Sequence, residues 1–366
     1  MADLTPRAIA WATTMTGHAG DKVVRAHPEP GTRLGLEYPI LRERREAWEA
    51  ERLALGATHA HGAGDRARPE MPDPERTCFE RDRDRIVHST AFRRLAGKTQ
   101  VVVHPSDHQR TRLTHALEVA QVATSIARGV GANVALAEAI ALGHDCGHGP
   151  GGHASEDAFD AFLPEGYDHG PWGADVVLTP LNLCRETLDG IRNHSWSRPT
   201  PSTVEGEIVS WADRIAYCAH DLEDAVGAGI VVLADVPSGV VEVAGATRRE
   251  QLSAFVREVI TTAVATGEIG MSAPLAAALA ALRTFNYERI YTRPESVAQS
   301  TAVIAVLRAL VSYYLENPTQ LPAAPQDPEQ LTRAAVAYVG GMTDRFAFDT
   351  AVQLLGWDRA RLPRPQ

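Results

Sequence analysis

The stretch that decides the fold is GHDCGHGPGGH, residues 143–153 of a chain of 366 residues. Leu136 and Ile140 precede His144 at intervals of four, so His144 should lie on the inward face of a helix that ends near Asp145. The glycine- and proline-rich turn that follows allows the backbone to approach a ligand closely. Histidines and an aspartate gathered in such a turn indicate a functional site rather than core packing.

Two segments far from this turn also carry histidine or aspartate on the inward face of a predicted helix. The segment RLTHALEVAQVA places His115 on the apolar face of a predicted helix. The segment VSWADRIAYCAHDLEDA places Asp213, Tyr217 and Asp221 on one helical face, because they follow one another at intervals of four. The sequence therefore predicts that the inward faces of several helices present polar side chains to one site.

Two imidazoles and two carboxylates are the predicted ligands of a divalent metal ion. Such a mixed site suits Mn, Mg, Fe, Co, Ni or Zn, and its open coordination positions would hold water and a phosphate oxygen. Taken singly, an inward histidine can be a core residue, and an aspartate on a long helix can be an ion-pair partner. The ordered set favours the metal, and its members are His115, His144, Asp145 and Asp213.

The remainder of the chain carries mostly helical patterns, so we predict an all-α fold with very little strand. Residues 98–104 and 230–236 are the best candidates for short strands, and Ser202 with Glu205 is predicted to form a capping box. We expect helices near residues 40–55, 80–97, 112–129, 133–144, 154–163, 181–194, 203–227, 248–267, 271–292, 295–316 and 328–339.

Three parts are predicted along the chain. Residues 1–35 form an N-terminal extension, residues 36–340 form the main helical domain, and residues 341–366 form a C-terminal helix and tail. The extension holds several glycines and prolines and shows no clear periodicity, so its role is not evident from the sequence.

Composition narrows the class of protein. A net charge of −10 disfavours nucleic acid as a partner, although a nucleotide needs only a few local cations. The four cysteines form no CxxC pair, which is typical of reduced thiols, so we expect a cytoplasmic protein. We see no signal peptide and no apolar run of the length that a membrane span needs.

The quoted segments resemble the HD-domain superfamily and, within it, the bacterial deoxyguanosinetriphosphate triphosphohydrolase family. The resemblance runs from Phe79 to at least Pro294. Its most specific pieces are AFRRLAGKTQV and EGEIVSWADRIAYCAHDLEDAV, joined by FERDRDRIVHST, GHDCGHGPGGHASEDAF, LNLCRETLDGIRNHSW and LRTFNYERIY. It implies an HD-domain helical bundle with additional C-terminal helices, in which the four predicted ligands hold the metal.

The resemblance also implies roles for the substrate contacts. Arg112 and Arg214 correspond to phosphate-binding residues, and Gln100 corresponds to a position beside the sugar and base. Tyr217 and Asp221 correspond to residues that hold the deoxyribose 3′-hydroxyl, with the tyrosine leaving no room for a 2′-hydroxyl. A dNTP is therefore the implied substrate.

Further roles concern proton transfer and the triphosphate. His153 and Glu156 correspond to a catalytic pair, while His148 and His169 correspond to further histidines on the phosphate side. Arg283, Tyr287 and Tyr291 share the spacing of a helix that grips the triphosphate, and Lys98 could add to the cationic clamp. The stretch from Gly170 to Gly173 departs from the polar run common in the family.

The implied reaction is attack at the α-phosphorus of a dNTP, dGTP or another, which releases the deoxynucleoside and inorganic triphosphate. Two alternatives keep the same metal site. One is an HD phosphohydrolase, including a phosphomonoesterase, that acts on a different or modified nucleotide, and the other is a non-catalytic dNTP sensor. The resemblance further implies a homo-oligomer and allosteric dNTP sites.

Overall fold

The computed structural model describes residues 4–20, 22–29, 31, 33–101 and 109–363. The chain divides into two units, residues 1–40 and residues 41–366, and each is described by itself. The first unit contains the helix α1 (Pro6–Thr13) and the antiparallel strands β1 (His18–Ala19) and β2 (Val24–Arg25). No residue of α1 is buried, so this unit has little core of its own.

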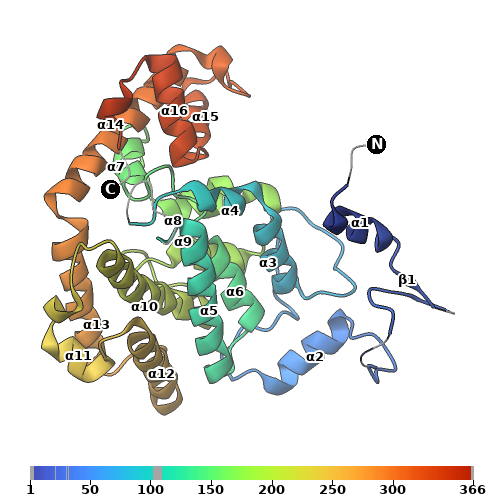
Figure 1. Cartoon of the computed structure of the whole chain (residues 1–366). Coiled ribbons are helices and arrows are strands. Elements are labelled where there is room, and N and C mark those ends of the chain that lie inside the picture. The colour runs from blue at the N-terminus through green and yellow to red at the C-terminus, as the bar shows by residue number, and fades with distance from the viewer. Residues whose placement is uncertain (1–3, 21, 30, 32, 102–108, 364–366) are drawn as a thin grey trace. The chain divides into compact units, whose positions relative to one another are not determined.

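Within the described residues of the second unit, every named element is a helix, which confirms the predicted all-α fold (Figure 1). Its first half contains α2 (Arg42–Arg52), α3 (Cys78–His88), α4 (Thr90–Arg94), α5 (Arg112–Val130), α6 (Val134–Gly143), α7 (Ala154–Asp160), α8 (His169–Trp172) and α9 (Arg185–Asn193). Its second half contains α10 (Val204–Gly227), α11 (Ser238–Ala244), α12 (Arg248–Thr266), α13 (Ala273–Asn286), α14 (Pro294–Glu316), α15 (Pro328–Gly340) and α16 (Asp344–Leu355).

Short segments of π-helix or 3₁₀-helix link these elements. Two of them have the wide π geometry, namely η2 (Gly173–Val177) after α8 and η5 (Tyr287–Tyr291) after α13. The others are the 3₁₀ turns η1 (Leu95–Gly97), η3 (Thr179–Leu181), η4 (Leu233–Asp235), η6 (Pro318–Gln320) and η7 (Arg359–Arg361).

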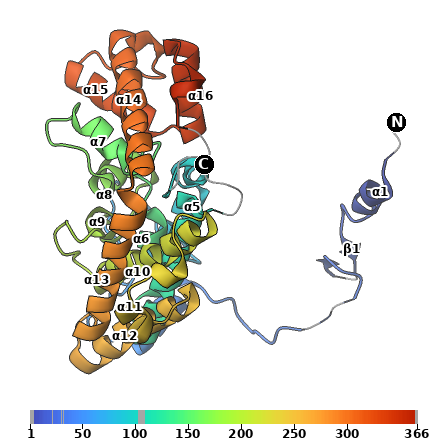
Figure 2. The ribbon, with the colours of Figure 1, turned by 60° about the vertical axis from the view of Figure 1, so that its left-hand side comes forward.

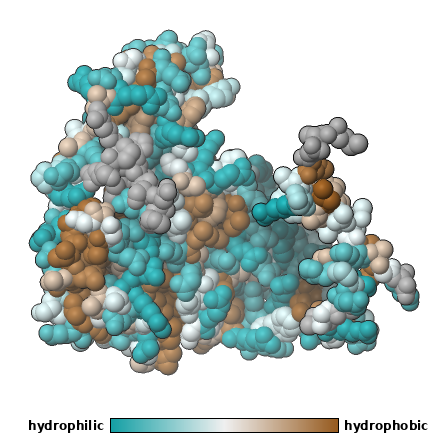
Figure 3. All heavy atoms as spheres, in the orientation of Figure 1, coloured by the Kyte–Doolittle hydropathy of each residue, from teal (hydrophilic) through white to brown (hydrophobic). Residues whose placement is uncertain are grey.

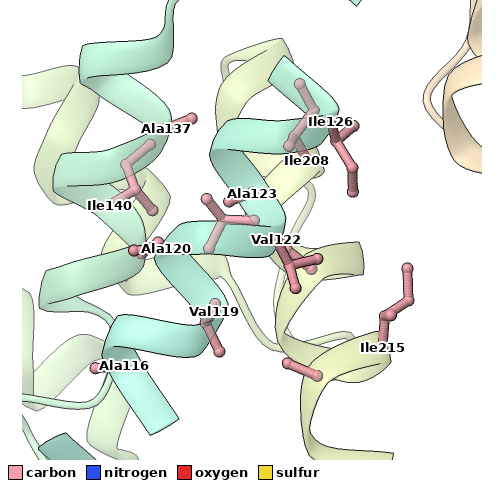
Figure 4. Packing of buried hydrophobic residues seen from close by; sticks show 14 of the residues in the cluster. Ala116, Val119, Ala120, Val122, Ala123, Ile126, Ala137, Ile140, Ile208 and Ile215 are labelled. Atoms are coloured by element: carbon pink, nitrogen blue, oxygen red, sulfur yellow. The ribbon is translucent and has the colours of Figure 1, made fainter. Parts of the chain in front are cut away.

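The main core lies where α5 packs between α6 and α10. Small and branched side chains of α5, including Ala120 and Val119, belong to the same buried cluster as Ile140 of α6 and Ile208 of α10 (Figure 4). Alanines let the helix axes approach closely, because their side chains end at Cβ. This close packing fixes the relative positions of the helices that carry the predicted ligands.

A second core joins α7 to the C-terminal helices α14, α15 and α16. In Figure 2, α14 runs beside α15 and α16. By length and composition alone, α14 could cross a membrane, which the sequence analysis did not expect. Its buried face, which includes Val303, Leu307 and Val311, packs into the second core. The apolar composition of α14 therefore has a packing role in this fold.

Some local predictions were wrong. The expected helix at 80–97 breaks at Ser89, whose extended backbone and side-chain bond to the Phe92 N–H begin a new helix. Residues 230–236 form a turn and η4 instead of a strand. Of residues 98–104, only Thr99 makes a strand-like bridge, to Thr111, and residues 102–104 lie outside the described residues.

The predicted capping box was also wrong. Thr203, not Ser202, caps α10 by accepting a hydrogen bond from the Gly206 N–H. Glu205 is fully buried and accepts hydrogen bonds from the backbone N–H groups of Thr58 and Asn133. Its carboxylate thus ties the loop after α2 to the start of α6.

Apolar side chains on the face seen in Figure 3 gather over α11, α12 and α13. Val243 on α11 and Val264 on α12 are among the exposed ones. Exposed apolar side chains are ordinary on the surface of a folded chain.

Candidate metal centre and active site

A pocket of about 420 Å³ opens between α5, α10 and the segment from α13 to the start of α14. This volume falls in the range of small-molecule sites. Among its lining side chains are most of the residues singled out from the sequence: Gln100, Arg112, His115, Asp145, His148, His153, His169, Asp213, Arg214, Tyr217, Asp221, Arg283, Tyr287 and Tyr291. His144 and Glu156 stand behind this lining and contact it.

The structure brings the four predicted metal ligands together. Nε2 of His115 on α5 lies 3.0 Å from Oδ1 of Asp213 on α10. Nε2 of His144, at the end of α6, lies 3.5 Å from Oδ1 of Asp145 and 3.7 Å from Oδ1 of Asp213. Side chains separated by almost a hundred residues therefore point at one place.

The donor set fits a divalent cation. Nδ1 of His144 lies 2.6 Å from the carbonyl oxygen of Ala141, and since a carbonyl only accepts, Nδ1 carries the proton. Nε2 of His144 is then a bare lone pair, and this buried atom has no hydrogen-bond partner among the described residues. An imidazole held in this way by its other nitrogen is typical of a metal ligand.

The two carboxylates of this set are held ionised. Burial by itself would raise the pKa of Asp145, but the neighbouring Arg112, His144 and His148 bring it well below its ordinary value. Burial likewise opposes ionisation of Asp213, and the hydrogen bond from His115 lowers the pKa of that carboxyl. Anionic oxygens are what a cation requires.

Glycines in and near the turn allow its close packing. A Cβ on Gly147 would lie 1.9 Å from the carbonyl oxygen of His169, so only glycine fits between them. A Cβ on Gly143 would lie 2.5 Å from Cδ1 of Ile191 on α9. These contacts bring the ends of α6 and α9 and the start of α8 to the same site.

Glu156 on α7 gathers three histidines. Its Oε1 lies 2.6 Å from Nδ1 of His169, 3.4 Å from Nδ1 of His153 and 3.5 Å from Nδ1 of His148. Its nearest partner is therefore His169 rather than His153. Burial opposes ionisation of Glu156, yet hydrogen bonds from His153 and His169 lower the pKa of its carboxyl strongly. The His153 side chain is largely exposed and the other two rings are buried.

Arg112 is a buried cation at the metal side of the pocket. It is 2% exposed, and its Nη1 donates to Oδ2 of Asp145 at 2.6 Å. Its Nε and Nη2 atoms have no hydrogen-bond partner within the part of the chain that the structure describes. Two buried, uncompensated donors beside a pocket are well placed to receive phosphate oxygens.

The other end of the pocket is built on α10 and the segment after α13. Tyr291 donates its hydroxyl to Oδ2 of Asp221 at 2.5 Å, while Oδ1 of Asp221 is buried and unpartnered among the described residues. Nε of Arg283 donates to the hydroxyl of Tyr217 at 2.9 Å. Tyr287 also lines this end and is half exposed.

Arg214, which lines the pocket, lies over an aromatic ring. Its guanidinium carbon is 3.5 Å from the centroid of the Trp196 ring, a close cation–π contact. Trp196 in turn donates its ring N–H to the carbonyl oxygen of Ser210 at 3.0 Å. The tryptophan therefore fixes where this arginine points.

Comparison with known proteins agrees with this geometry. The HD domain family matches residues 112–218, and the phosphohydrolase-associated domain family matches residues 269–353. A deoxyguanosinetriphosphate triphosphohydrolase-like protein of Caldanaerobacter subterraneus subsp. tengcongensis is 38% identical over 335 residues, which cover 89% of this chain and 97% of that protein. The chain belongs to the deoxyguanosinetriphosphate triphosphohydrolase-like family of HD-domain proteins.

A second member of this family, from Desulfatibacillum aliphaticivorans, is 38% identical over 338 residues, which cover 84% of this chain and 95% of that protein. A solved structure of a phosphohydrolase from Bacteroides thetaiotaomicron is similar with a TM-score of 0.45 and 16% identity, over 74% of this chain and 67% of that one.

The pocket of this HD-domain phosphohydrolase draws on both matched regions. His115 and Asp213 come from the HD domain, whereas Arg283 and Tyr291 come from the phosphohydrolase-associated domain. Asp221 lies between the two matches, on the last part of α10. The metal side of the pocket therefore comes from the HD domain, whereas the far end combines α10 with the phosphohydrolase-associated domain.

His194 is among the site residues that the sequence analysis missed. His194 follows α9, is 2% exposed and lines the pocket. Burial, with the neighbouring His144 and His169, lowers its pKa to about 3. A signal was present, because His194 lies three residues after the buried Ile191, on the inward face of an amphipathic helix.

Lys98 does not join the cationic clamp that the sequence suggested. Its Nζ is buried, donates to the carbonyl oxygens of His148 and, at 2.9 Å, Gly340, and lies outside the pocket lining. Asp344 acts beside it, since its carboxylate accepts from the N–H groups of Thr99 and Gly151. These contacts anchor the glycine-rich turn to the C-terminal helices.

Proposed function

We propose that this chain hydrolyses a deoxynucleoside triphosphate, dGTP or another, at the α-phosphorus, and releases the deoxynucleoside and inorganic triphosphate. The observation that carries the proposal is one pocket with two chemically different ends. A metal-ligand set and a buried arginine lie at one end, and a buried carboxylate with a free oxygen lies at the other. The relatives named as deoxyguanosinetriphosphate triphosphohydrolase-like proteins support this choice of substrate class.

The cationic side chains of the pocket suit a triphosphate. Arg112 offers two unpartnered donors from a buried position, where a charge-assisted hydrogen bond is strong. Arg214 and Arg283 add further charge to the pocket, and each is held by an aromatic partner. The charge of the substrate is thus met locally in a chain whose net charge is −10.

The far end suits a deoxyribose. Oδ1 of Asp221 is a free buried acceptor, which a sugar 3′-hydroxyl would satisfy. Tyr217 lines the pocket one helical turn before Asp221 and is held by Arg283. A ribose would have to place its additional hydroxyl against this tyrosine, so we expect deoxynucleotides to be preferred.

The proton for the leaving 5′-oxygen is assigned to His153. In the imidazolium form, Nδ1 of His153 donates to Glu156, and the proton on Nε2 passes to the leaving 5′-oxygen, which leaves His153 neutral. His148 and His169 lie behind it with buried rings, where they hold Glu156 in place. A divalent ion held by His115, His144, Asp145 and Asp213 would supply an activated water and polarise the phosphorus.

Product analysis tests the proposal. The purified chain is incubated with each dNTP and each NTP under Mn²⁺, Mg²⁺, Co²⁺, Ni²⁺, Zn²⁺ or anaerobic Fe²⁺, and both products are separated by chromatography. We expect deoxynucleoside and triphosphate in equal amounts, with ¹⁸O from labelled water in the triphosphate. Release of orthophosphate, or a preference for NTPs, would overturn the assignment and favour another phosphohydrolase activity. Nucleotide binding without turnover under every metal would favour a sensor.

A further inference from the structure

Two cysteines that are far apart in the sequence meet outside the active-site pocket. Cys78 is the first residue of α3, and Cys184 directly precedes α9. A Cβ on Gly64 would lie 2.9 Å from Sγ of Cys78 and 3.5 Å from Sγ of Cys184, and the two side chains are hydrogen-bonded to each other. Both cysteines are free thiols in this structure. The two sulfur atoms therefore border the same small space, which Gly64 leaves open.

The two thiols differ in their exposure. Cys184 is fully buried, whereas Cys78 is partly exposed and lines a second pocket of about 330 Å³. A hydroperoxide oxidises an accessible thiol in preference to a buried one. Cys78 is therefore the thiol that an oxidant reaches first, and Cys184 lies directly behind it.

A buried ion pair holds the two cysteines beside each other. Asp82 of α3 forms a salt bridge with Arg66 at 2.6 Å and accepts a hydrogen bond from the backbone N–H of Cys184 at 2.7 Å. Nη2 of Arg66 donates to the carbonyl oxygen of Cys78 at 3.1 Å. One aspartate and one arginine thus connect the start of α3 with the start of α9, so the approach of the two thiols is fixed by the fold.

We propose that Cys78 and Cys184 are oxidised by hydrogen peroxide to a reversible disulfide that stabilises the folded chain. In the first step, Sγ of Cys78 attacks a peroxide oxygen, the O–O bond breaks and water leaves, so that Cys78 becomes a sulfenic acid. In the second step, Sγ of Cys184 attacks Sγ of Cys78, the S–O bond breaks, and the hydroxyl leaves as water with the thiol proton of Cys184. The two thiols lose two electrons, and one peroxide is reduced to two waters.

The disulfide would close a long loop of the chain. The segment between the two cysteines contains α5, α6 and α7, so it is a large part of the helical unit. A covalent link across a long loop reduces the conformational freedom of the unfolded chain, which stabilises the folded one. We therefore expect the oxidised chain to unfold at a higher temperature than the reduced chain. This inference is independent of the proposed hydrolase activity, because it concerns thiol chemistry alone.

Thiol counting tests the proposal. The full chain is reduced, freed of reductant, treated with hydrogen peroxide at neutral pH, quenched with catalase, and unfolded in N-ethylmaleimide before mass analysis of the whole chain and its peptides. We expect two of the four cysteines to escape labelling and one crosslinked peptide pair to contain Cys78 and Cys184. Dithiothreitol should restore full labelling. The melting temperature should rise on oxidation and return to its initial value on reduction.

Variants separate the roles of the two thiols. Cys184→Ser should stop the reaction at the sulfenic acid of Cys78, which dimedone traps, whereas Cys78→Ser should leave Cys184 reduced. Gly64→Ala places a methyl group between the sulfur atoms, so it should keep all four labels over the time in which the wild type loses two. Gly62→Ala is the matched control, because Gly62 has a similar positive φ, +84° against +88°, and open space around it.

Full labelling of the wild-type chain after peroxide treatment would overturn the proposal, and so would a crosslink between other cysteines. Oxidation of Cys184 at the wild-type rate in Cys78→Ser would refute the order of the two steps. A melting temperature that does not rise with crosslinking would refute the stabilising role. The peptide map of the wild-type chain decides the pairing even if a variant does not fold.

Discussion

The two walls of the pocket differ in how they are built. One wall, the long-helix wall, presents His115 from α5 and Asp213 from α10, with His144 at the end of α6 directly behind them. The other, the turn wall, presents side chains from the glycine-rich turn and from the ends of short helices, among them His169 and His194. Long helices place ligands by their periodicity, whereas the turn wall depends on close backbone contacts and on distant anchors.

The largest loss of metal binding and activity should follow from a substitution in the long-helix wall. We expect His144→Ala to lose tightly bound metal and more than about 100-fold in kcat/KM, because even outer partners of metal ligands typically cost 10- to 100-fold. Metal analysis and steady-state kinetics measure the two losses. His220→Gln, a buried histidine outside the pocket lining, should keep both properties. A His144→Ala protein with full metal content and activity would remove this ligand assignment.

A single added methyl group should disrupt the packing of the turn wall and destabilise the fold. Gly147→Ala would force a Cβ against the His169 carbonyl, so we expect a loss of about 1–3 kcal/mol or more in the free energy of unfolding, together with reduced activity. Chemical denaturation measures the first. Gly227→Ala is the control, because a Cβ there meets nothing within 4 Å and alanine favours helix. Equal stability of the two variants would contradict the packing argument.

The carboxylate at the far end should show in the pH dependence of stability. Burial raises the pKa of Asp221 from 3.8 to about 7, so the folded chain holds this proton more tightly than the unfolded chain. Its contribution to stability is full below about pH 4 and is lost as the pH rises through 7. Asp221→Asn cannot ionise, so metal-free variant and wild type should diverge across this window in favour of the variant, by at most about 4 kcal/mol.

Denaturation of both proteins at pH 4.5, 6 and 8 in the presence of a chelator measures this difference. A constant gap between them would show that Asp221 does not titrate in this range. Binding of deoxynucleotides by Asp221→Asn at unchanged affinity would separately count against its contact with the sugar hydroxyl.

The smallest effect should come from the ring under Arg214. Trp196→Ala removes a cation–π contact of about 1 kcal/mol, so we expect KM to rise by about fivefold with kcat little changed. Trp196→Phe should recover much of the loss, since a phenyl ring can still support the guanidinium. Steady-state kinetics with dGTP or the preferred dNTP measures both. A fall in kcat alone would contradict a role confined to substrate binding.

Much of the long-helix wall could be predicted from the sequence. Apolar residues on α5 and α10 recur with the helical period, so the inward direction of His115, Asp213 and Asp221 follows from counting residues. Prediction from the sequence fails where hydrogen bonds of polar side chains determine the local structure. The break at Ser89 and the burial of Glu205 depend on hydrogen bonds that no hydrophobic pattern signals.

The turn wall shows why the other contacts of the site could not be predicted from the sequence. Lys98 is a cation near predicted phosphate contacts in the sequence, yet it anchors a carbonyl 242 residues away. Glu156 follows His153 by three residues, yet its shortest contact is with His169 on another helix. Such pairings are set by how elements pack, because a side chain satisfies its charge with whatever partner the tertiary contacts bring closest.

The sequence alone determined that this chain is a helical HD-domain protein and which inward side chains could bind a metal, because helical periodicity and a short glycine-rich motif are local properties. Only the tertiary structure decided that His194 joins the site, that Cys78 and Cys184 meet, and that the C-terminal helices hold the turn. These features depend on distances between segments far apart in the chain, which are fixed by packing and by the pairing of buried polar groups.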